Sequence, residues 1–214
     1  MSANPNHLLV EDQDTCGAVI GLMRQHIGWP DSRDECPAFI EVRGSSGAVL
    51  NKKFLSVKMK ESGLASLGLI VDADTDFLAR WDTVKDVCRY LGSVPPEICP
   101  DDGLILDIGG KKLGVWIMPD NKSQGMLENF CHTLVPPEAK PLWEFARKCV
   151  EKAGTKKAPY NKEFHTDKAH IHTWLAWQDP PGERMGAAIT KKILLRGSDS
   201  AQCFVCWFKT LFDI

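Results

Sequence analysis

The sequence of 214 residues lacks any apolar run near the roughly 18 residues that a membrane-spanning helix needs, so no membrane partner is expected. Residues 1–7 lack the basic flank and the apolar stretch of a signal peptide, and the cytoplasm is therefore the expected compartment. Internal repeats and low-complexity segments are absent as well. With 43% hydrophobic and 25% charged residues, the composition is globular and excludes a largely disordered or fibrous chain.

A second Cys-x-x-Cys is also missing. Among eight cysteines only Cys203 and Cys206 form a close pair, whereas a structural zinc site usually needs four ligands. The cysteines are interpreted as reduced residues packed in the core, and a zinc site completed by His170 and His172 is the alternative. The pattern G-x-x-x-x-G-K-[ST] does not occur, so no P-loop ATPase is expected within this chain.

Charge is unevenly distributed, although the formal net charge is only −2. Residues 140–196 contain 12 Lys and Arg against 6 Asp and Glu, a balance of +6 that leaves −8 for the rest. An acidic first part and a basic last part would suit a metal site that faces a polyanion. Solvated lysines on helix surfaces also explain these numbers and are the alternative.

Strand and helix signals alternate in the first half of the chain. Predicted strands at residues 7–10, 38–42 and 67–71 alternate with predicted helices at 14–27, 49–60 and 77–91. This order predicts an α/β fold with a central, mostly parallel, Rossmann-like sheet flanked by helices. A hairpin or a pair of edge strands is expected at residues 104–106 and 113–118.

The last part of the chain is predicted to be mainly helical. We expect an α/β core over residues 1–135 and a helical extension over 136–214 that packs on the core as one compact unit. The seven tryptophans are interpreted as core residues, with stacking on nucleobases as the alternative. Apolar residues on the last predicted helix, 204–211, would also suit a homo-oligomer.

Two of the predicted strands end in carboxylates, Glu11 after the first strand and Asp72 and Asp74 after the third. Ligands of an open parallel sheet bind at the carboxyl ends of its strands. Neighbouring carboxylates raise each other's pKa unless a cation lies between them, and Mg²⁺ prefers oxygen ligands. The pattern predicts a magnesium site, while helix capping by Asp74 or Asp76 is the alternative.

The segments that carry these residues resemble the Toprim domain of topoisomerases, bacterial-type primases and OLD (overcoming lysogenisation defect) nucleases. Residues 8–14, Leu-Leu-Val-Glu-Asp-Gln-Asp, are similar to the first Toprim motif, and residues 69–74, Leu-Ile-Val-Asp-Ala-Asp, are similar to the D-x-D motif. Residues 115–121, 125–128 and 168–177 are similar to a small bacterial Toprim-like family of unknown function that is related to the OLD nucleases. The resemblance implies a Toprim-like form of the α/β fold.

The same resemblance implies which residues act. The implied metal ligands are Glu11, Asp72, Asp74, Asp120 and Glu128, which would hold one or two ions of Mg²⁺ or Mn²⁺. Lys168 is expected to stabilise charge on a phosphate, and Glu11 is expected either to hold a metal or to serve instead as general acid or base. A surface position for Lys168 and an interaction of Glu128 with a helix dipole are the alternatives.

These expectations favour a Mg²⁺-dependent Toprim-type nuclease that hydrolyses phosphodiester bonds of DNA or RNA, with phage defence as the implied role. Without a P-loop, the chain is expected to work alone or with a separate ATPase or other defence protein. The first alternative is a non-cleaving Toprim-like module that binds nucleic acid or protein and regulates. The second is a haloacid-dehalogenase-type phosphatase, because residues 72–75, Asp-Ala-Asp-Thr, resemble the first motif of that family.

Overall fold

The computed structural model describes residues 4–31, 35–195 and 197–214. Its centre is a five-stranded sheet with the order β2-β1-β3-β5-β4, in which β4 is antiparallel to β5 and the other pairs are parallel. The strands are β1 (Asn6–Val10), β2 (Phe39–Val42), β3 (Ser66–Asp72), β4 (Leu104–Asp107) and β5 (Lys112–Met118). The predicted α/β fold with a mostly parallel sheet is confirmed.

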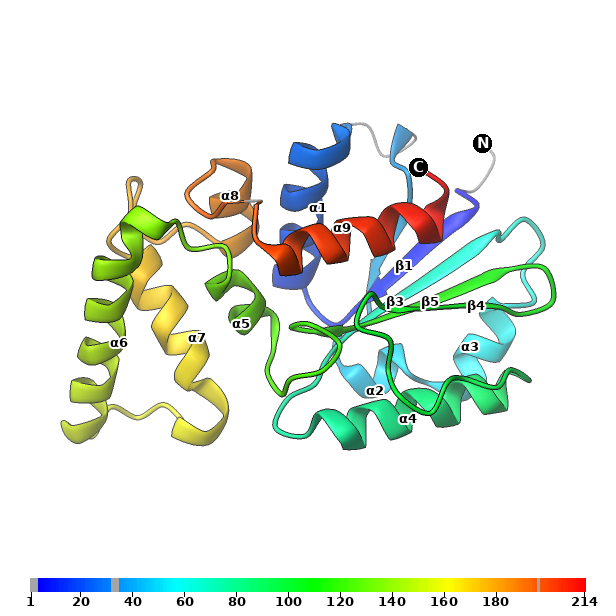
Figure 1. Cartoon of the computed structure of the whole chain (residues 1–214), viewed down its shortest axis with the longest axis horizontal. Helices are drawn as coiled ribbons and strands as arrows, with labels where there is room; N and C mark the ends of the chain where they lie inside the picture. The colour runs from blue at the N-terminus through cyan, green and yellow to red at the C-terminus, as the bar shows by residue number, and fades with distance from the viewer. Residues whose placement is uncertain (1–3, 32–34, 196) are drawn as a thin grey trace.

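Helices cover both faces of this sheet. They are α1 (Gln13–Ile27), α2 (Ser46–Val49), α3 (Lys52–Lys58), α4 (Phe77–Tyr90), α5 (Leu127–His132), the 3-10 helix η2 (Pro137–Ala139), α6 (Lys140–Thr155), α7 (Lys162–Leu175), α8 (Met185–Thr190) and α9 (Asp199–Phe212). Figure 1 shows α1 and α9 over one face and α2, α3 and α4 over the other, with α6 and α7 beside the sheet at the left. The flanking helices predicted from the sequence are therefore present on both sides.

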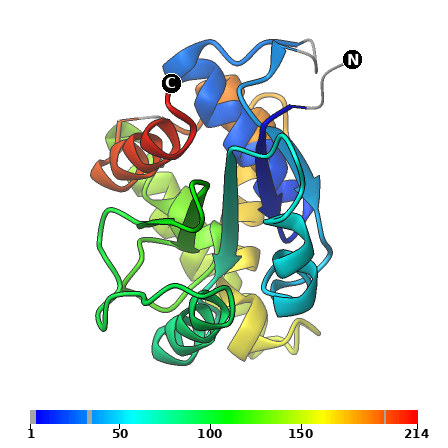
Figure 2. The same ribbon diagram turned by 90° about the vertical axis from the view of Figure 1, so that its right-hand side faces the viewer.

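The alternation of side chains along the strands explains why β1 and β3 carry so few polar residues. Leu8 and Val10 pack in one hydrophobic cluster with α1 and α9, whereas Leu9 packs in a second cluster with α2, α3 and α4. In β3, Ile70 belongs to the first cluster and Leu69 to the second. Figure 2 shows these layers from the side. Strands covered on both faces are expected to be apolar throughout.

Four details differ from the sequence predictions. β4 and β5 form the predicted hairpin, but β5 is not an edge strand, because it lies between β3 and β4 and pairs with both. The predicted helix over 49–60 is divided between two helices, α2 and α3, because the side chain of Asn51 caps the start of α3. Asp12 rather than Asp14 caps α1. The short helix α8 was not predicted, because it covers little more than one turn.

The tryptophans follow the prediction, since six are buried in the core and Trp177 is exposed. The interpretation of the cysteines as core residues is wrong for Cys206, which is exposed on α9. The apolar residues of α9 are largely buried in the fold, among them Phe204, Phe208 and Leu211. They therefore leave α9 little of the free apolar face that would suit a homo-oligomer, and the homo-oligomer itself stays a prediction.

One hydrophobic cluster joins both predicted parts of the chain. It contains Leu8 and Ile70 from the sheet together with Trp174, Ile189 and Phe208 from the later helices. The helical segment therefore packs on the α/β core, while the boundary after residue 135 stays a prediction. No helix in the described part of the chain combines the length and the apolar character that a membrane span requires.

Glycines let α1 and α8 touch through their backbones. A Cβ atom added to Gly186 of α8 would lie 2.3 Å from the carbonyl carbon of Gly17 in α1. Because backbone cannot move aside as a flexible side chain does, we expect Gly186→Ala to lower the free energy of unfolding by about 2 kcal/mol or more. Urea denaturation measures this change.

Gly47→Ala is the matched control for this prediction. A methyl group added to Gly47 in α2 would meet nothing within 4 Å. Alanine is about 0.5–1 kcal/mol more favourable than glycine inside a helix, so this variant is expected to equal or slightly exceed the wild type in stability. Equal stability of Gly186→Ala and the wild type would contradict the close contact of α1 and α8.

Candidate functional site

The carboxyl ends of β1 and β3 bring two of the predicted acidic residues together. Glu11 follows β1 directly, Asp72 is the last residue of β3, and the two strands are parallel neighbours. One side-chain oxygen of Glu11, Oε1, accepts a hydrogen bond from the backbone N–H of Asp72 at 2.9 Å. The predicted meeting of Glu11 with the D-x-D segment at one edge of the sheet is therefore present.

Asp74 lies in a turn that is bound on two sides. Its backbone is in the left-handed region, with φ of 56°, and forms an isolated antiparallel bridge with Gly125. The Asp74 N–H donates to the Gly125 carbonyl at 2.9 Å, and the Gly125 N–H donates to the Asp74 carbonyl at 2.7 Å. This bridge fixes the loop after β3 against the loop that leads into α5.

Arg80 of α4 contacts the carboxyl end of β3 and the turn that follows it. Its Nε donates to the Asp72 carbonyl at 2.7 Å, and its Nη2 donates to the Asp74 carboxylate at 2.7 Å. The side chain of Arg80 is mostly buried, so the two contacts join a cation to the acidic turn in a partly desolvated position. Asp76 caps α4, and the helix-capping alternative is thus confirmed for Asp76.

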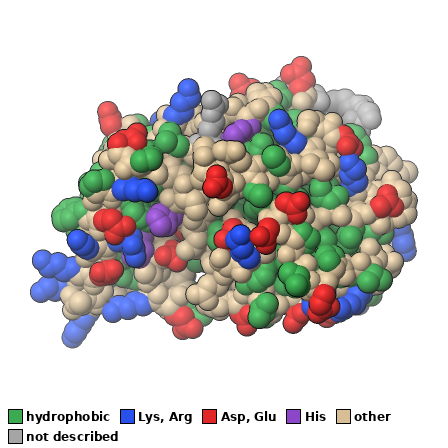
Figure 3. All heavy atoms as spheres, viewed as in Figure 1, with side chains coloured by type: hydrophobic (Ala, Val, Ile, Leu, Met, Phe, Trp, Pro, Cys, Tyr) green, Lys and Arg blue, Asp and Glu red, His purple; other side chains and the backbone are tan. Residues whose placement is uncertain are grey.

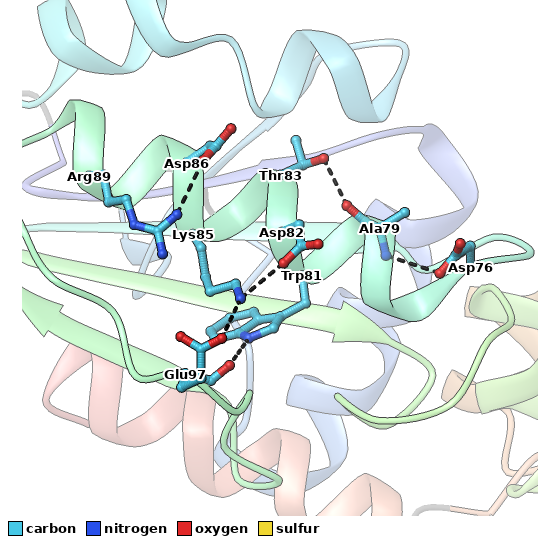
Figure 4. A network of polar contacts seen from close by, with 9 residues as sticks. All are labelled: Asp76, Ala79, Trp81, Asp82, Thr83, Lys85, Asp86, Arg89 and Glu97. Atoms are coloured by element: carbon cyan, nitrogen blue, oxygen red, sulfur yellow. Dashed lines mark hydrogen bonds and ion pairs between the residues drawn. The ribbon is translucent and has the colours of Figure 1, made fainter.

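A second group of contacts ties α4 to the segment that follows it (Figure 4). Lys85 forms ion pairs with Asp82 at 2.9 Å and with Glu97 at 3.2 Å. The indole N–H of Trp81 donates to the Glu97 carbonyl at 2.9 Å. These contacts anchor the segment that follows α4 to the helix itself, and they thereby hold the helix that carries Arg80.

Glu128 and Lys168 form the third part of the site. Glu128 lies in the first turn of α5 and is only 4% exposed, while Lys168 comes from the middle of α7. Lys168 Nζ lies 2.9 Å from Glu128 Oε1. Asp72 reaches the same helix, because its Oδ1 accepts from the Leu127 N–H at 3.1 Å. The start of α5 therefore meets the end of β3.

Asp120 is the predicted ligand that the described contacts do not join to the others. It follows β5, next to β3, but its carboxylate accepts hydrogen bonds from the Ser123 N–H at 2.7 Å and from the Ser123 hydroxyl at 3.0 Å. These bonds close a local turn. Its role as a metal ligand stays a prediction.

Burial, with a smaller contribution from neighbouring charges, raises the pKa of two of the carboxylates, Glu11 and Asp72. Burial raises the pKa of Asp72 well above its ordinary value, and the charges of Glu11, Glu128 and Asp74 raise it further. Burial also raises the pKa of Glu11, against the opposing hydrogen bond from the Asp72 N–H and the charge of Arg80. Buried carboxylates that disfavour each other's charge are characteristic of functional sites and favour a cation between them.

The four carboxylates supply the hard oxygen ligands that Mg²⁺ or Mn²⁺ takes in proteins. In residues 4–31, 35–195 and 197–214, however, no three or more His, Cys, Asp or Glu side chains are already arranged around one metal position. Each carboxylate instead has a partner within the protein: a backbone N–H for Glu11 and Asp72, and a cation for Asp74 and Glu128. The donor set thus fits the ion chemically, and its side chains would exchange these partners to hold one.

The surroundings of the site include a basic surface and two pockets. Figure 3 shows Lys and Arg side chains gathered at the left end of the molecule, over α6 and α7. Exposed lysines of this region include Lys148, Lys152, Lys156 and Lys157. One pocket lies between Asp74, Gly125 and the first half of α7, and a second lies between α5, α6 and α7. The site is therefore open along the side that faces the helical extension.

Comparison with known proteins identifies one family whose model matches almost the whole chain. A family model described as "Protein of unknown function (DUF3226)" matches residues 5–213. The chain belongs to this family. Searches of curated proteins and of solved structures found no match. Because the description of the DUF3226 family names no activity, the function has to be argued from the site.

Two residues of the site in this DUF3226 protein escaped the sequence analysis. Arg80 was missed, although its place one turn after the helix cap Asp76 was a usable signal. Asn129 was missed as well, and it connects α5 to α7 by donating to the Asp167 carboxylate at 2.9 Å. No sequence signal pointed to Asn129, because its partner lies 38 residues away.

We expect Arg80→Ala to lower the free energy of unfolding by about 1–3 kcal/mol. The variant loses two hydrogen bonds of a charged group and leaves Asp74 and Glu11 without the nearby cation. Arg89→Ala is the matched control, because Arg89 lies on the same helix in an exposed ion pair with Asp86, and such pairs contribute about 0–1 kcal/mol. Equal losses in the two variants, measured by urea denaturation, would contradict the anchoring role of Arg80.

Proposed function

We propose that this protein is a Mg²⁺-dependent nuclease of the Toprim type that hydrolyses phosphodiester bonds of DNA or RNA. The proposal is supported by one observation above all: Glu11, Asp72, Asp74 and Glu128 come from three segments that adjoin where β1 and β3 end and α5 begins. Two cations, Arg80 and Lys168, contact this group directly. A site with hard oxygen ligands and adjacent cations suits a phosphate ester as substrate.

Glu11, Asp72, Asp74 and Glu128 would hold one or two ions of Mg²⁺ or Mn²⁺. Such ions, when bound, would activate water and neutralise the charge of the phosphate. The raised pKa of Glu11 suits a group that takes up or releases a proton during the reaction. Lys168 Nζ, released from Glu128, would donate to a phosphate oxygen and stabilise the developing charge.

The proposal is tested by incubating the purified protein with plasmid DNA, single-stranded DNA and tRNA in Mg²⁺ or Mn²⁺. We expect cleavage of at least one of these, its loss in EDTA, and a loss of about 100-fold or more in Glu11→Gln. Glu138→Gln, at an exposed position of η2, serves as the matched control and is expected to cleave normally. Absence of metal-dependent cleavage, or normal cleavage by Glu11→Gln, would overturn the proposal.

The second candidate is a regulatory module that binds nucleic acid or a protein without cleaving. This candidate is favoured by the partners that all four carboxylates already have within the protein. It predicts binding that survives replacement of Glu11 and Asp72. A phosphatase of the haloacid-dehalogenase type predicts instead turnover of a small phosphomonoester that is abolished by Asp72→Asn. Phage defence and a separate ATPase partner are proposed from the resemblance alone.

A further inference from the structure

A pocket next to Glu128 carries features that the proposed chemistry does not use. It lies between α5, α6 and α7 and is lined by residues that include His132, Trp143, Arg147, Asp167 and His170. We call it the α6 pocket. Glu128 and Asn129 also line it, so it adjoins the acidic site directly.

The α6 pocket has a rigid aromatic platform. The exposed imidazole of His132 stacks on Trp143, with ring centroids 4.6 Å apart and an interplanar angle of 18°. Trp143 is only 4% exposed and meets the edge of Trp174 at 6.2 Å. Burial lowers the pKa of His132, which favours the neutral ring at pH 7. A flat ring that is fixed from behind and open in front is a surface on which a planar ligand can stack.

Two buried nitrogen atoms of the pocket have no hydrogen-bond partner among the described residues. They are Trp143 Nε1 and His170 Nε2, and both side chains are more than nine-tenths buried. Buried polar atoms in folded proteins are almost always paired. The other ring nitrogen of His170 lies 3.5 Å from the Asp167 carboxylate. Both atoms are closed to solvent, and the His132 ring covers Trp143, so the polar edge of a ligand would reach only His170 Nε2, after a small movement of the side chains.

The charges around the pocket argue for a neutral planar group rather than a bare anion. Asp167 and Glu128 would repel an anion placed among them, and Arg147 already has an ion pair with Glu144 at 3.3 Å. A nucleobase carries no net charge, has a face that stacks, and has donors and acceptors at its edge.

The position of the pocket links it to the acidic site. Asn129 and Asp167 are hydrogen-bonded at 2.9 Å and line both the α6 pocket and the neighbouring pocket that contains Asp74. The two pockets thus share one wall. We propose that the α6 pocket binds one nucleobase of a single-stranded segment of the substrate, stacked on His132, next to the phosphate held at the acidic site. This inference rests on the proposed nuclease function.

The test measures binding without cleavage. Labelled decathymidylate, and a set of decathymidylates that each lack one base, are titrated with the protein in EDTA, and fluorescence anisotropy gives the Kd. We expect His132→Ala to bind intact decathymidylate about 5- to 150-fold more weakly than the wild type, because the variant loses stacking on one base. His132→Phe retains a stacking ring and is expected to bind within about three-fold of the wild type.

His172→Ala is the matched control, because His172 is exposed on α7 outside both pockets. It is expected to leave the Kd unchanged. One abasic position is expected to weaken binding by the wild type and to have no effect on binding by His132→Ala. Failure of the wild type to bind, equal binding by His132→Ala, or the same abasic penalty in both proteins would overturn the inference.

The outcome of this binding test can be separated from the outcome of the cleavage test. Cleavage in Mg²⁺ together with an unchanged Kd in His132→Ala would remove the base pocket and leave the nuclease proposal intact. A base-dependent Kd without any cleavage would remove the nuclease proposal and leave a nucleic-acid-binding module. Circular dichroism of His132→Ala and His132→Phe confirms that each variant is folded before the titrations are compared.

Discussion

Asp72→Asn is expected to abolish metal-dependent cleavage while making the metal-free protein more stable. Asp72 is the carboxylate on which burial and four neighbouring acidic residues act together. Asparagine keeps the oxygen that accepts the Leu127 N–H and removes the charge that repels Glu11 and Glu128. We expect cleavage to fall about 100-fold or more, because a central anionic ligand is lost.

The stability gain should depend on pH, and its sign follows from the raised pKa. The folded protein holds a proton on Asp72 at pH values where the unfolded chain, with a pKa near 3.8, has lost it. Wild-type stability therefore falls as pH rises from about 4 to the pKa of the folded state. Because Asp72→Asn lacks this titration, its advantage in free energy of unfolding should grow over that interval and then stay constant. Urea denaturation in EDTA at several pH values measures it.

Mg²⁺ should reverse the relative stability of the two proteins, so that the wild type becomes more stable than Asp72→Asn. A ligand that binds only the folded state raises the melting temperature, so Mg²⁺ is expected to stabilise the wild type and to have little effect on Asp72→Asn. Asp102→Asn, at an exposed position far along the chain, is the matched control and should behave as the wild type in every assay. Destabilisation of metal-free Asp72→Asn, or an equal response of both variants to Mg²⁺, would contradict the role of Asp72.

The sequence predicted those parts of the site that follow from strand ends. Glu11 and Asp72 could be placed together because each ends an apolar strand, and parallel strands end at the same edge of a sheet. The local sequence pattern was sufficient to predict that these two carboxylates lie at the same edge of the sheet. Lys168 was also placed near the acidic residues, but only through the resemblance of its segment to a known family.

The parts that escaped prediction depend on contacts between distant segments. The order of β3, β5 and β4 is set by pairing across the sheet, which an apolar run does not reveal. The hydrogen bond from Arg80 to the Asp72 carbonyl depends on the direction in which one side chain leaves α4. The α6 pocket arises where α5, α6 and α7 meet, and its residues read in sequence as ordinary positions of amphipathic helices.

Lys168→Met is expected to cost about 1–3 kcal/mol of unfolding free energy, because it leaves a buried carboxylate without its cation. Glu128 is 4% exposed, whereas the Lys168 side chain is 43% exposed. Breaking a fully buried pair costs about 3–5 kcal/mol, and solvent near the half-exposed partner reduces that figure. Burial alone lowers the pKa of Lys168, but the hydrogen bond and charge of Glu128 raise it above its usual value of 10.5. The loss should therefore be constant near neutral pH and diminish only above about pH 10.5.

The double variant Lys168→Met with Glu128→Gln separates the ion pair from the packing of each side chain. Glutamine at position 128 carries no charge, so most of the stability lost in Lys168→Met should return, and a double-mutant cycle from urea denaturation gives the coupling energy. Cleavage is expected to stay low in the two single variants and in the double variant, because each lacks the proposed metal ligand Glu128, the proposed phosphate-binding group Lys168, or both. Restored stability together with low activity would separate the catalytic contribution of the pair from its contribution to folding. If the double variant is as unstable as the sum of the single variants, the 2.9 Å contact between Lys168 and Glu128 contributes nothing to folding, and Lys168 is an ordinary surface residue.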